Sequence, residues 1–238
     1  MSLTLKPLSK NTPCLLLGSR LLLFLFFQSM IALAANSWEI SEKYWLLTAT
    51  LTNIISILIL YFTYRSRSDN YFRIFRFRRI SLRKDILIFA VLMLLAGPLA
   101  FLPNYFLSTW LWEDPDIPFM MMFRPIESWL VSFLILAFPV TIVFAELATY
   151  FAFIMPELIK QLKSKWIAVM LPVLFLSLQH CTLPFIPDVK FILYRGLVFL
   201  PFALFIGISI YKRPTLFPFF AIIHGLMDAG TALMFFHK

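Results

Sequence analysis

Long apolar stretches, separated by short polar segments, limit the folds open to this chain more than any other feature. The stretches are residues 13–35, 44–64, 86–107, 126–158, 166–183, 191–211 and 215–236. An α-helix needs about 20 apolar residues to cross the hydrocarbon core of a bilayer. Helices also satisfy their backbone hydrogen bonds within one segment, as a lipid environment requires. The pattern therefore predicts an all-α polytopic membrane protein with about seven transmembrane helices.

The composition leaves little material for anything outside the membrane. Of the 238 residues, 61% are hydrophobic and 14% are charged, whereas about 25% of the residues of a soluble domain are charged. We therefore predict a single transmembrane domain over residues 1–238. Residues 1–125 hold the N-terminal spans and a basic cytoplasmic loop. Residues 126–238 hold the last four spans, which we expect to form the core bundle that carries the functional site.

The charge of the polar segments alternates along the chain and predicts an orientation. Residues 1–12, 65–84, 160–165 and 212–213 are basic, residues 36–43 and 108–125 are net negative, and residues 184–190 are neutral. Lysine and arginine favour the cytoplasmic side of a membrane. We therefore expect a plasma (cell inner) membrane protein with a cytoplasmic N-terminus and a C-terminus outside. Most of the net charge of +9 lies in short segments beside the spans, so membrane lipids, and not nucleic acid, are the predicted partners.

The first apolar stretch and the two cysteines each have an alternative interpretation. Residues 13–35 contain Ala32-Leu-Ala34, which fits the small-x-small site of a cleaved signal peptide. The stretch is longer than a signal-peptide core, so we predict a retained span. Cys14 and Cys181 lie in apolar surroundings. Two cysteines are too few for a disulfide framework, and we expect them to be small core residues.

The most basic segment of the chain follows the second apolar stretch. Residues 65–84 carry eight arginine or lysine residues against Asp69 alone, interleaved with aromatic residues. Such a mixture can bind RNA. However, Arg73, Arg76, Arg79 and Arg83 recur at helical spacing. The spacing favours an amphipathic helix that lies on an anionic membrane surface.

Four polar residues within the later apolar stretches are candidates for a functional site: Glu146, His180, His224 and Asp228. A buried, unpaired carboxylate is costly, so an ionisable residue in a span indicates a function with a partner nearby. Glu146 and His180 are equally distant from Lys163 along the sequence, one before it and one after it. Two antiparallel helices that leave one turn therefore bring both groups to the same depth. His224 and Asp228, one turn apart on the last span, reach overlapping depths.

This set of side chains supports hydrolysis. Glu146 beside His180, directly or through one water, could hold and deprotonate a water molecule. His224, with Asp228 behind it, could donate to the oxyanion that forms when water attacks a carbonyl. The same donors, Glu146, His180 and His224, are also a usual set for a hydrolytic zinc ion with an open fourth position. The residues alone leave both possibilities open. Glu146→Gln is expected to abolish the reaction and to leave stability nearly unchanged.

The ordered motifs resemble the CAAX protease and bacteriocin-processing family of intramembrane proteases. That family carries Glu-Glu-x-x-x-Arg, usually followed by Gly and, five residues after the Arg, by Pro. It then carries Phe-x-x-x-His and His-x-x-x-Asn or Asp. Here the first motif reads Glu146-Leu-Ala-Thr-Tyr-Phe-Ala, with Pro156 at the expected offset. The second reads Leu176-Ser-Leu-Gln-His180, with Phe175 one residue early, and the third, His224-Gly-Leu-Met-Asp228, matches fully. The resemblance covers residue 126 to the end.

The first motif departs from the family pattern. Leu147, Phe151 and Ala152 stand where the family has its second Glu, its Arg and its Gly. A register shifted by one would set Glu146 against the second Glu, but it would misplace Pro156. In the unshifted register the water-activating Glu and both His remain, and the Glu and Arg are lost together, as a removed ion pair would be. Such an exchange for apolar groups is often neutral, or it marks a relative that kept the fold and lost the activity.

The resemblance implies a membrane-embedded endopeptidase that cleaves a membrane-associated protein or peptide with a Glu/His-activated water. A non-catalytic relative that binds a membrane peptide, or gives immunity to one, is the alternative. A small transporter that uses Glu146 and the histidines as a proton relay is a third interpretation. The sequence has no internal repeat, which disfavours the transporter.

Overall fold

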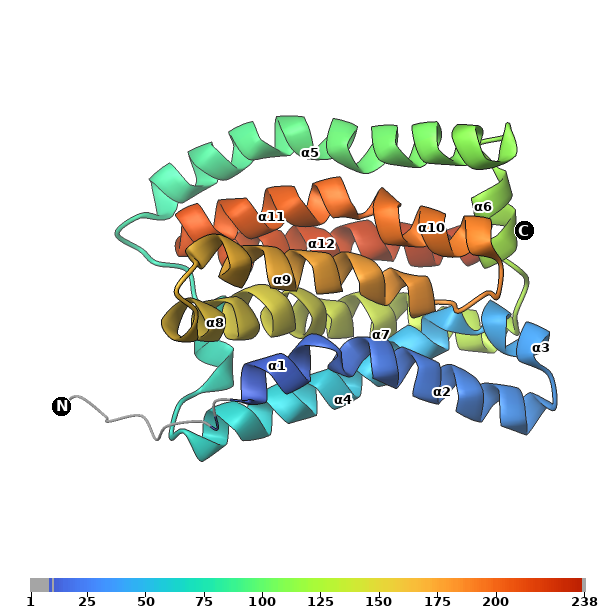
Figure 1. Ribbon diagram of the computed structural model, residues 1–238, viewed down its shortest axis with the longest axis horizontal. Coiled ribbons are helices and arrows are strands. Elements are labelled where there is room, and N and C mark those ends of the chain that lie inside the picture. The colour runs from blue at the N-terminus through green and yellow to red at the C-terminus, as the bar shows by residue number, and fades with distance from the viewer. Residues whose placement is uncertain (1–8, 10, 237–238) are drawn as a thin grey trace.

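The computed structural model describes residue 9 and residues 11–236, and all the regular structure within them is helical. The α-helices are α1 (Thr12–Leu17), α2 (Ser19–Ala35), α3 (Trp38–Lys43), α4 (Trp45–Ser66), α5 (Leu82–Trp112), α6 (Ile117–Met122), α7 (Ser128–Leu147), α8 (Met155–Gln161), α9 (Lys165–Leu178), α10 (Val189–Val198), α11 (Leu200–Lys212) and α12 (Phe217–Leu233). The 3-10 turns are η1 (Tyr71–Phe75), η3 (Gln179–Thr182), η4 (Pro214–Leu216) and η5 (Met234–Phe236), and η2 (Ala148–Ile154) is π-helical. The longer helices run side by side along one axis (Figure 1).

Six helical stretches of the described chain are long and apolar enough to cross a membrane. They are Trp45–Ser66, Leu82–Trp112, Ser128–Gln161, Lys165–Thr182, Val189–Lys212 and Pro214–Leu233. This confirms an all-α polytopic membrane protein. The first predicted span differs, because the helix is interrupted at Gly18 and its longer part, α2, has 17 residues. Together α1 and α2 still run along the bundle, from the end that holds α8 to the end that holds α3 (Figure 1).

The connections divide by charge between the two ends of the bundle. The basic segments that join α4 to α5, α8 to α9, and α11 to α12 lie at one end, and α3 and α6 lie at the other (Figure 1). This separation agrees with the alternation of charge in the sequence. Two helical stretches that each run the length of the bundle separate one basic segment from the next, so the basic segments lie at the same end.

The prediction of an amphipathic surface helix within residues 65–84 was wrong. Residues 65–66 end α4 and residues 82–84 begin α5. Between them lies the 3-10 turn η1, and the other residues form turns and chain without regular structure. Two of the segment's aromatic side chains point into the protein: the Tyr71 hydroxyl donates to the backbone carbonyl of Phe144, and Phe75 packs against the rings of Phe144 and Phe217. Burial of these rings against α7 and α12 outweighs the helical spacing of the arginines. The segment therefore connects α4 to α5 and is held against α7 and α12 by these side chains.

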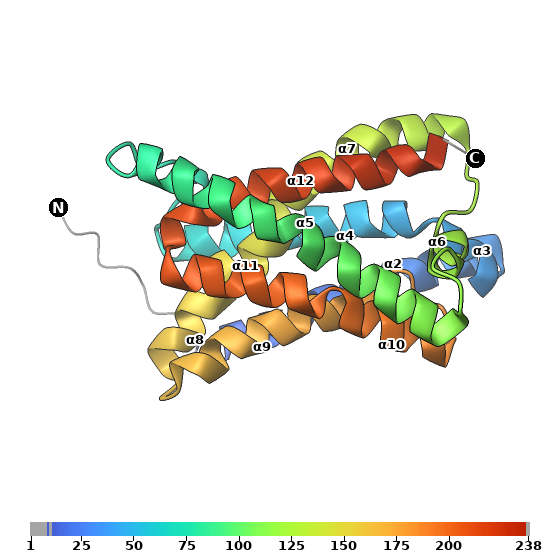
Figure 2. The same cartoon turned by 90° about the horizontal axis from the view of Figure 1, so that it is seen from above.

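Helix α5 lies on the outside of the bundle. It is continuous over 31 residues, with Pro98 and Pro103 inside it. Only Asp85, Ala96 and Ser108 are buried along it. Figure 2 shows it crossing over α10 and α11. At about 1.5 Å per residue it is about 46 Å long, so it must tilt in a bilayer or project beyond the hydrocarbon core.

Polar contacts hold the end of the bundle near α3 and α6. The Tyr44 hydroxyl donates to Glu127 at 2.7 Å, just before α4 and α7 begin. This hydrogen bond lowers the pKa of the Glu127 carboxyl below its usual value. Arg124 donates to Glu42 at 2.6 Å. The Tyr44–Glu127 contact joins the N-terminal part to the last four spans, and the Arg124–Glu42 contact lies within the N-terminal part.

The two cysteines differ from the expectation of core residues. Cys14, on α1, is exposed, so the expectation was wrong for this residue. Cys181 is half-buried, and its thiol lies near Gly196 of α10. An exposed cysteine on an apolar helix is compatible with a surface that faces lipid.

Candidate functional site

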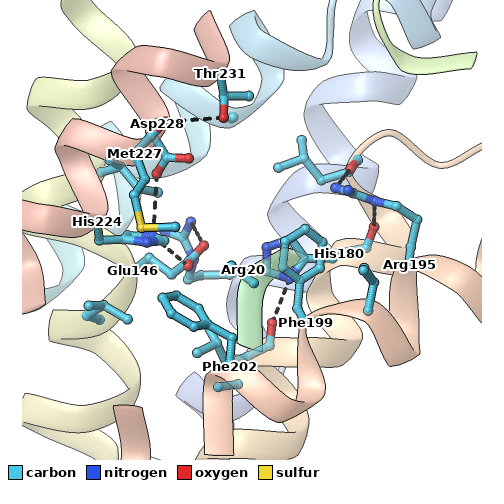
Figure 3. A pocket seen from close by; sticks show the side chains of 18 of the residues that line it. Arg20, Glu146, His180, Arg195, Phe199, Phe202, His224, Met227, Asp228 and Thr231 are labelled. Atoms are coloured by element: carbon cyan, nitrogen blue, oxygen red, sulfur yellow. Dashed lines mark hydrogen bonds and ion pairs between the residues drawn. The ribbon is translucent and has the colours of Figure 1, made fainter. Parts of the chain in front are cut away.

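The four residues predicted from the sequence line one cavity. Glu146 lies in the last turn of α7, His180 in η3, and His224 and Asp228 on α12. All four line a cavity of about 180 Å³ whose remaining walls are mostly apolar side chains. Figure 3 shows Glu146, His224 and Asp228 on one side, and His180 on the other. Residue counts along the helices predicted overlapping depths for these four groups, and all four line this cavity.

The helix widens immediately after Glu146. Residues Ala148–Ile154 form a π-helix, and such turns are frequent at functional sites. Pro156 has no N–H to donate to the carbonyl of Ala152. That carbonyl accepts instead from the Tyr64 hydroxyl at 3.4 Å. The proline and the π-helix thus set the end of α7, where Glu146 enters the cavity.

His224 is the imidazole that lies against Glu146. Its Nε2 is 3.0 Å from Oε1 of Glu146 and 3.5 Å from Oδ2 of Asp228. Nε2 thus lies within ion-pair distance of both carboxylates, as the dashed lines of Figure 3 show. Asp228 is one helical turn from His224, as the His-x-x-x-Asp spacing predicts. The pairing of Glu146 with His224, in place of the expected His180, reflects the close approach of α7 and α12.

His180 faces the same cavity without a direct hydrogen bond to Glu146 among the described residues. Its Nδ1 donates to the carbonyl of Leu176 at 2.8 Å, because a carbonyl oxygen only accepts. The ring stacks on Phe199, with 3.9 Å between the centroids. In the neutral ring the other nitrogen, Nε2, is then a hydrogen-bond acceptor. The expected direct contact with Glu146 is not formed, and contact through a water remains a prediction.

A buried arginine from the N-terminal part of the chain completes the site. Arg20, on α2, is 0% exposed, and its Nη2 lies 3.4 Å from Oε2 of Glu146. The guanidinium also donates to Asn53 at 2.9 Å, Ser56 at 3.1 Å and Gln179 at 2.9 Å. The site is therefore not confined to the last four spans, since α2 and α4 supply the cation and two of its partners.

Two of these residues carry signals that the sequence interpretation missed. Arg20 is an arginine within an apolar run, which is the same feature that singled out Glu146. Gln179, next to His180, donates to Oε2 of Glu146 at 2.8 Å. Arg20 and Gln179 thus share one carboxylate oxygen. Arg195, a buried residue of α10, also lines the cavity.

The positions where the resembled family carries charge are apolar and buried here. Leu147 and Phe151 are each 1% exposed and belong to one hydrophobic core cluster. A Cβ built at Gly207 would lie 3.0 Å from Phe151, so the ring packs directly on α11. Buried apolar side chains thus stand at the two positions where the family carries Glu and Arg, and both charges are lost together.

The residues present do not fit the three-ligand zinc site that the sequence left open. Among the described residues, no three His, Cys, Asp or Glu side chains are grouped closely enough to hold a metal ion. Glu146 already accepts from Arg20 and Gln179 and contacts His224. The guanidinium would also repel a metal cation at that carboxylate.

Gly225 allows the close approach that brings His224 to Glu146. A Cβ at this position would lie 2.3 Å from Cγ2 of Val143 and 3.0 Å from the carbonyl oxygen of Pro139, both on α7. Gly225→Ala should therefore lower the free energy of unfolding by about 1–3 kcal/mol through overpacking. Gly230→Ala on the same helix meets nothing within 4 Å and should be neutral or stabilising. Unfolding in detergent micelles compares the two, and equal stability would show that the helices do not pack this tightly.

The fold and the cavity together define a class: a polytopic α-helical membrane protein with a buried polar site between its helices. No protein-family model, no curated protein and no solved structure matches the chain. The resemblance to the CAAX protease and bacteriocin-processing family thus depends on the motif residues themselves, now seen around one cavity.

Proposed function

We propose that this protein is an intramembrane endopeptidase that hydrolyses a peptide bond of a membrane-associated protein or peptide. One observation carries the proposal: a carboxylate and two imidazoles, from three separate helical segments, line one small cavity among apolar helices. A Glu and a His around a cavity supply the proton acceptors that activation of water requires. The low polarity of the surroundings strengthens each of their electrostatic interactions.

The free acceptor positions favour a water held between Glu146 and His180. A carboxylate has about four acceptor positions, and three contacts are made here, by Arg20 and Gln179 at Oε2 and by His224 at Oε1. The fourth acceptor position, on Oε1, is free for a water. His180 offers Nε2 as an acceptor, since Nδ1 is used by Leu176. One water has two hydrogens and can donate to both groups.

Proton transfer in this proposal runs through His224. Glu146 takes a proton from the water as the water oxygen attacks the peptide carbonyl, and a C–O bond forms. His224 gives its Nε2 proton to the leaving nitrogen as the C–N bond breaks, and Glu146 returns the first proton to His224. Asp228 holds the imidazole from one turn away. His224 is thus a proton donor to the leaving group, in place of the oxyanion role expected from the sequence.

The test is hydrolysis by the purified protein in liposomes. Wild-type protein is incubated with apolar membrane peptides, and mass spectrometry records new peptide ends. Asp228→Asn serves as a mild variant, because an amide can still hydrogen-bond to His224. Cleavage that requires folded protein supports the proposal. Wild-type protein that binds these peptides and cuts none of them would contradict it.

One feature of the site favours a second function. Glu146 is already contacted by Arg20, Gln179 and His224. A carboxylate held in this way is also typical of a buried ion pair with a structural role. In that case the protein is a non-catalytic member of the same fold that binds a membrane peptide or gives immunity to one. Protection of cells against a membrane-active peptide, unchanged by Glu146→Asp, would support this second function.

We propose a plasma membrane location with the basic end of the bundle in the cytoplasm. Single cysteines at the exposed positions Asp116 and Arg78, in a protein with Cys14 and Cys181 replaced by Ala, report the two ends of the bundle. An impermeant thiol reagent added to intact cells should label Asp116→Cys and not Arg78→Cys, because basic segments stay inside. Labelling of Arg78→Cys in intact cells would reverse the orientation.

A further inference from the structure

Arg195 is a buried cation for which the described residues provide no anion. It lies on α10, is 5% exposed, and lines the cavity. Its Nε donates to the carbonyl of His180 at 3.2 Å and its Nη2 donates to the carbonyl of Leu183 at 2.6 Å. The guanidinium also lies over the ring of Phe199, 4.9 Å from its centroid. Each of these partners is neutral.

The other buried arginine of the cavity, Arg20, has a counter-ion. Arg20 has Glu146 as its counter-ion and three neutral acceptors besides. A buried charge is costly unless it is paired and hydrogen-bonded. Two carbonyls and a ring offset part of the cost for Arg195. No hydrogen bond within the described chain reaches its Nη1, so a donor and a full positive charge remain at the cavity wall.

We propose that Arg195 binds a carboxylate of the peptide substrate and so determines which peptides enter the cavity. The inference deepens the proposed function, on which it rests, by naming a substrate class: an apolar peptide with one carboxylate near the cleaved bond. A guanidinium binds a carboxylate through paired N–H donors, which gives geometric specificity as well as charge. The carboxylate supplies the anion that the described residues do not.

The position of Arg195 connects this recognition to the reacting groups. One of its two carbonyl partners, His180, lies within η3, and the other, Leu183, follows directly after that turn. Figure 3 shows Arg195 on the His180 side of the cavity, away from the side of Glu146 and His224. A bound carboxylate would therefore hold the peptide against the His180 wall. The cavity of about 180 Å³ has the volume of about six waters, so it accepts a small apolar side chain beside the carboxylate.

The experiment measures peptide binding to wild-type protein in detergent micelles, without turnover. Four versions of one apolar peptide carry Glu or Gln at an internal position and a free or amidated C-terminus. We expect replacement of the recognised carboxylate by its amide to weaken binding about tenfold or more, as loss of a charged hydrogen bond does. Dependence on Glu over Gln assigns a side-chain carboxylate, and dependence on the free C-terminus assigns a terminal one. Equal binding of the fully neutral peptide would overturn the proposal.

Variants of α10 provide a second measurement on the same peptides. Arg195→Gln keeps a donor for a backbone carbonyl and removes the charge, so its discrimination between acid and amide should fall to about onefold. Lys190→Gln removes an exposed positive charge from the same helix and should keep the full discrimination. Loss of discrimination in Lys190→Gln would point to the general charge of the protein and overturn the role of Arg195.

The two proposals fail in different ways. Wild-type protein that prefers the carboxylate peptide but never cleaves it retains the Arg195 site and removes the peptidase function. Wild-type protein that cleaves acid and neutral peptides with equal affinity and rate retains the peptidase function and removes the Arg195 site. If Arg195→Gln does not fold, the comparison of the four peptides on wild-type protein still decides.

Discussion

Arg20→Met should lower the free energy of unfolding by about 3–5 kcal/mol, because it leaves the carboxylate of Glu146 buried without its cation. Methionine matches much of the length of arginine without its charge. The change also removes the donors to Asn53, Ser56 and Gln179, all of which are buried. Unfolding in mild detergent micelles, followed by denaturant titration, measures the loss.

A double variant separates the ion pair from the rest of the network. Arg20→Met with Glu146→Gln removes both charges, and it should be more stable than Arg20→Met alone, since an apolar or neutral pair often costs little. Arg73→Met is the control: Arg73 is 70% exposed and lies 3.6 Å from Asp69, and such pairs contribute about 0–1 kcal/mol. A stable Arg20→Met variant would mean that Glu146 does not depend on Arg20.

Glu146→Gln should reduce peptide hydrolysis by about 10²–10⁴-fold, the contribution of a positioned general base. An amide cannot take a proton from water. The rate is measured per folded protein, with the folded fraction determined by size-exclusion chromatography and circular dichroism. Activity retained by folded Glu146→Gln would remove Glu146 from the mechanism.

The structure changes the expected effect of Glu146→Gln on stability. The sequence predicted almost no change, because a lone buried charge would be removed. Glu146 is instead the counter-ion of Arg20 and accepts from Gln179, so the variant should be destabilised. Glu157→Gln is the matched control for activity: Glu157 lies on the same predicted span and pairs with Arg67 and Lys160, away from the cavity. It should retain the wild-type rate.

The helices and the depth of the site were predictable because each follows from a local count. The length of an apolar run sets whether a helix can cross the membrane. Equal distances along the sequence on both sides of Lys163 set the depth of Glu146 and His180 on two antiparallel helices. The length of the apolar run mispredicts a helix only for the first stretch, where the helix is interrupted at Gly18. Helix length and the depth of a residue along its helix can therefore be predicted without knowing which helices are neighbours.

The connection over residues 65–84 was mispredicted because its arginine spacing is a local pattern. Tyr71 and Phe75 belong instead to the packing around Phe144 and Phe217, which lie far along the chain. Burial of aromatic rings in that core determines the path of the connection. A periodicity within one short segment carries no information about a partner that is distant in the sequence.

The sequence by itself determined that this is a helical membrane protein, and that one carboxylate and two imidazoles lie at overlapping depths within it. Only the tertiary structure decided the contacts: Glu146 with His224, Arg20 with Glu146, and Arg195 without an anion among the described residues. The reason is geometric. Depth along a helix follows from residue number, but the direction in which each helix faces depends on packing between helices, such as the close approach at Gly225.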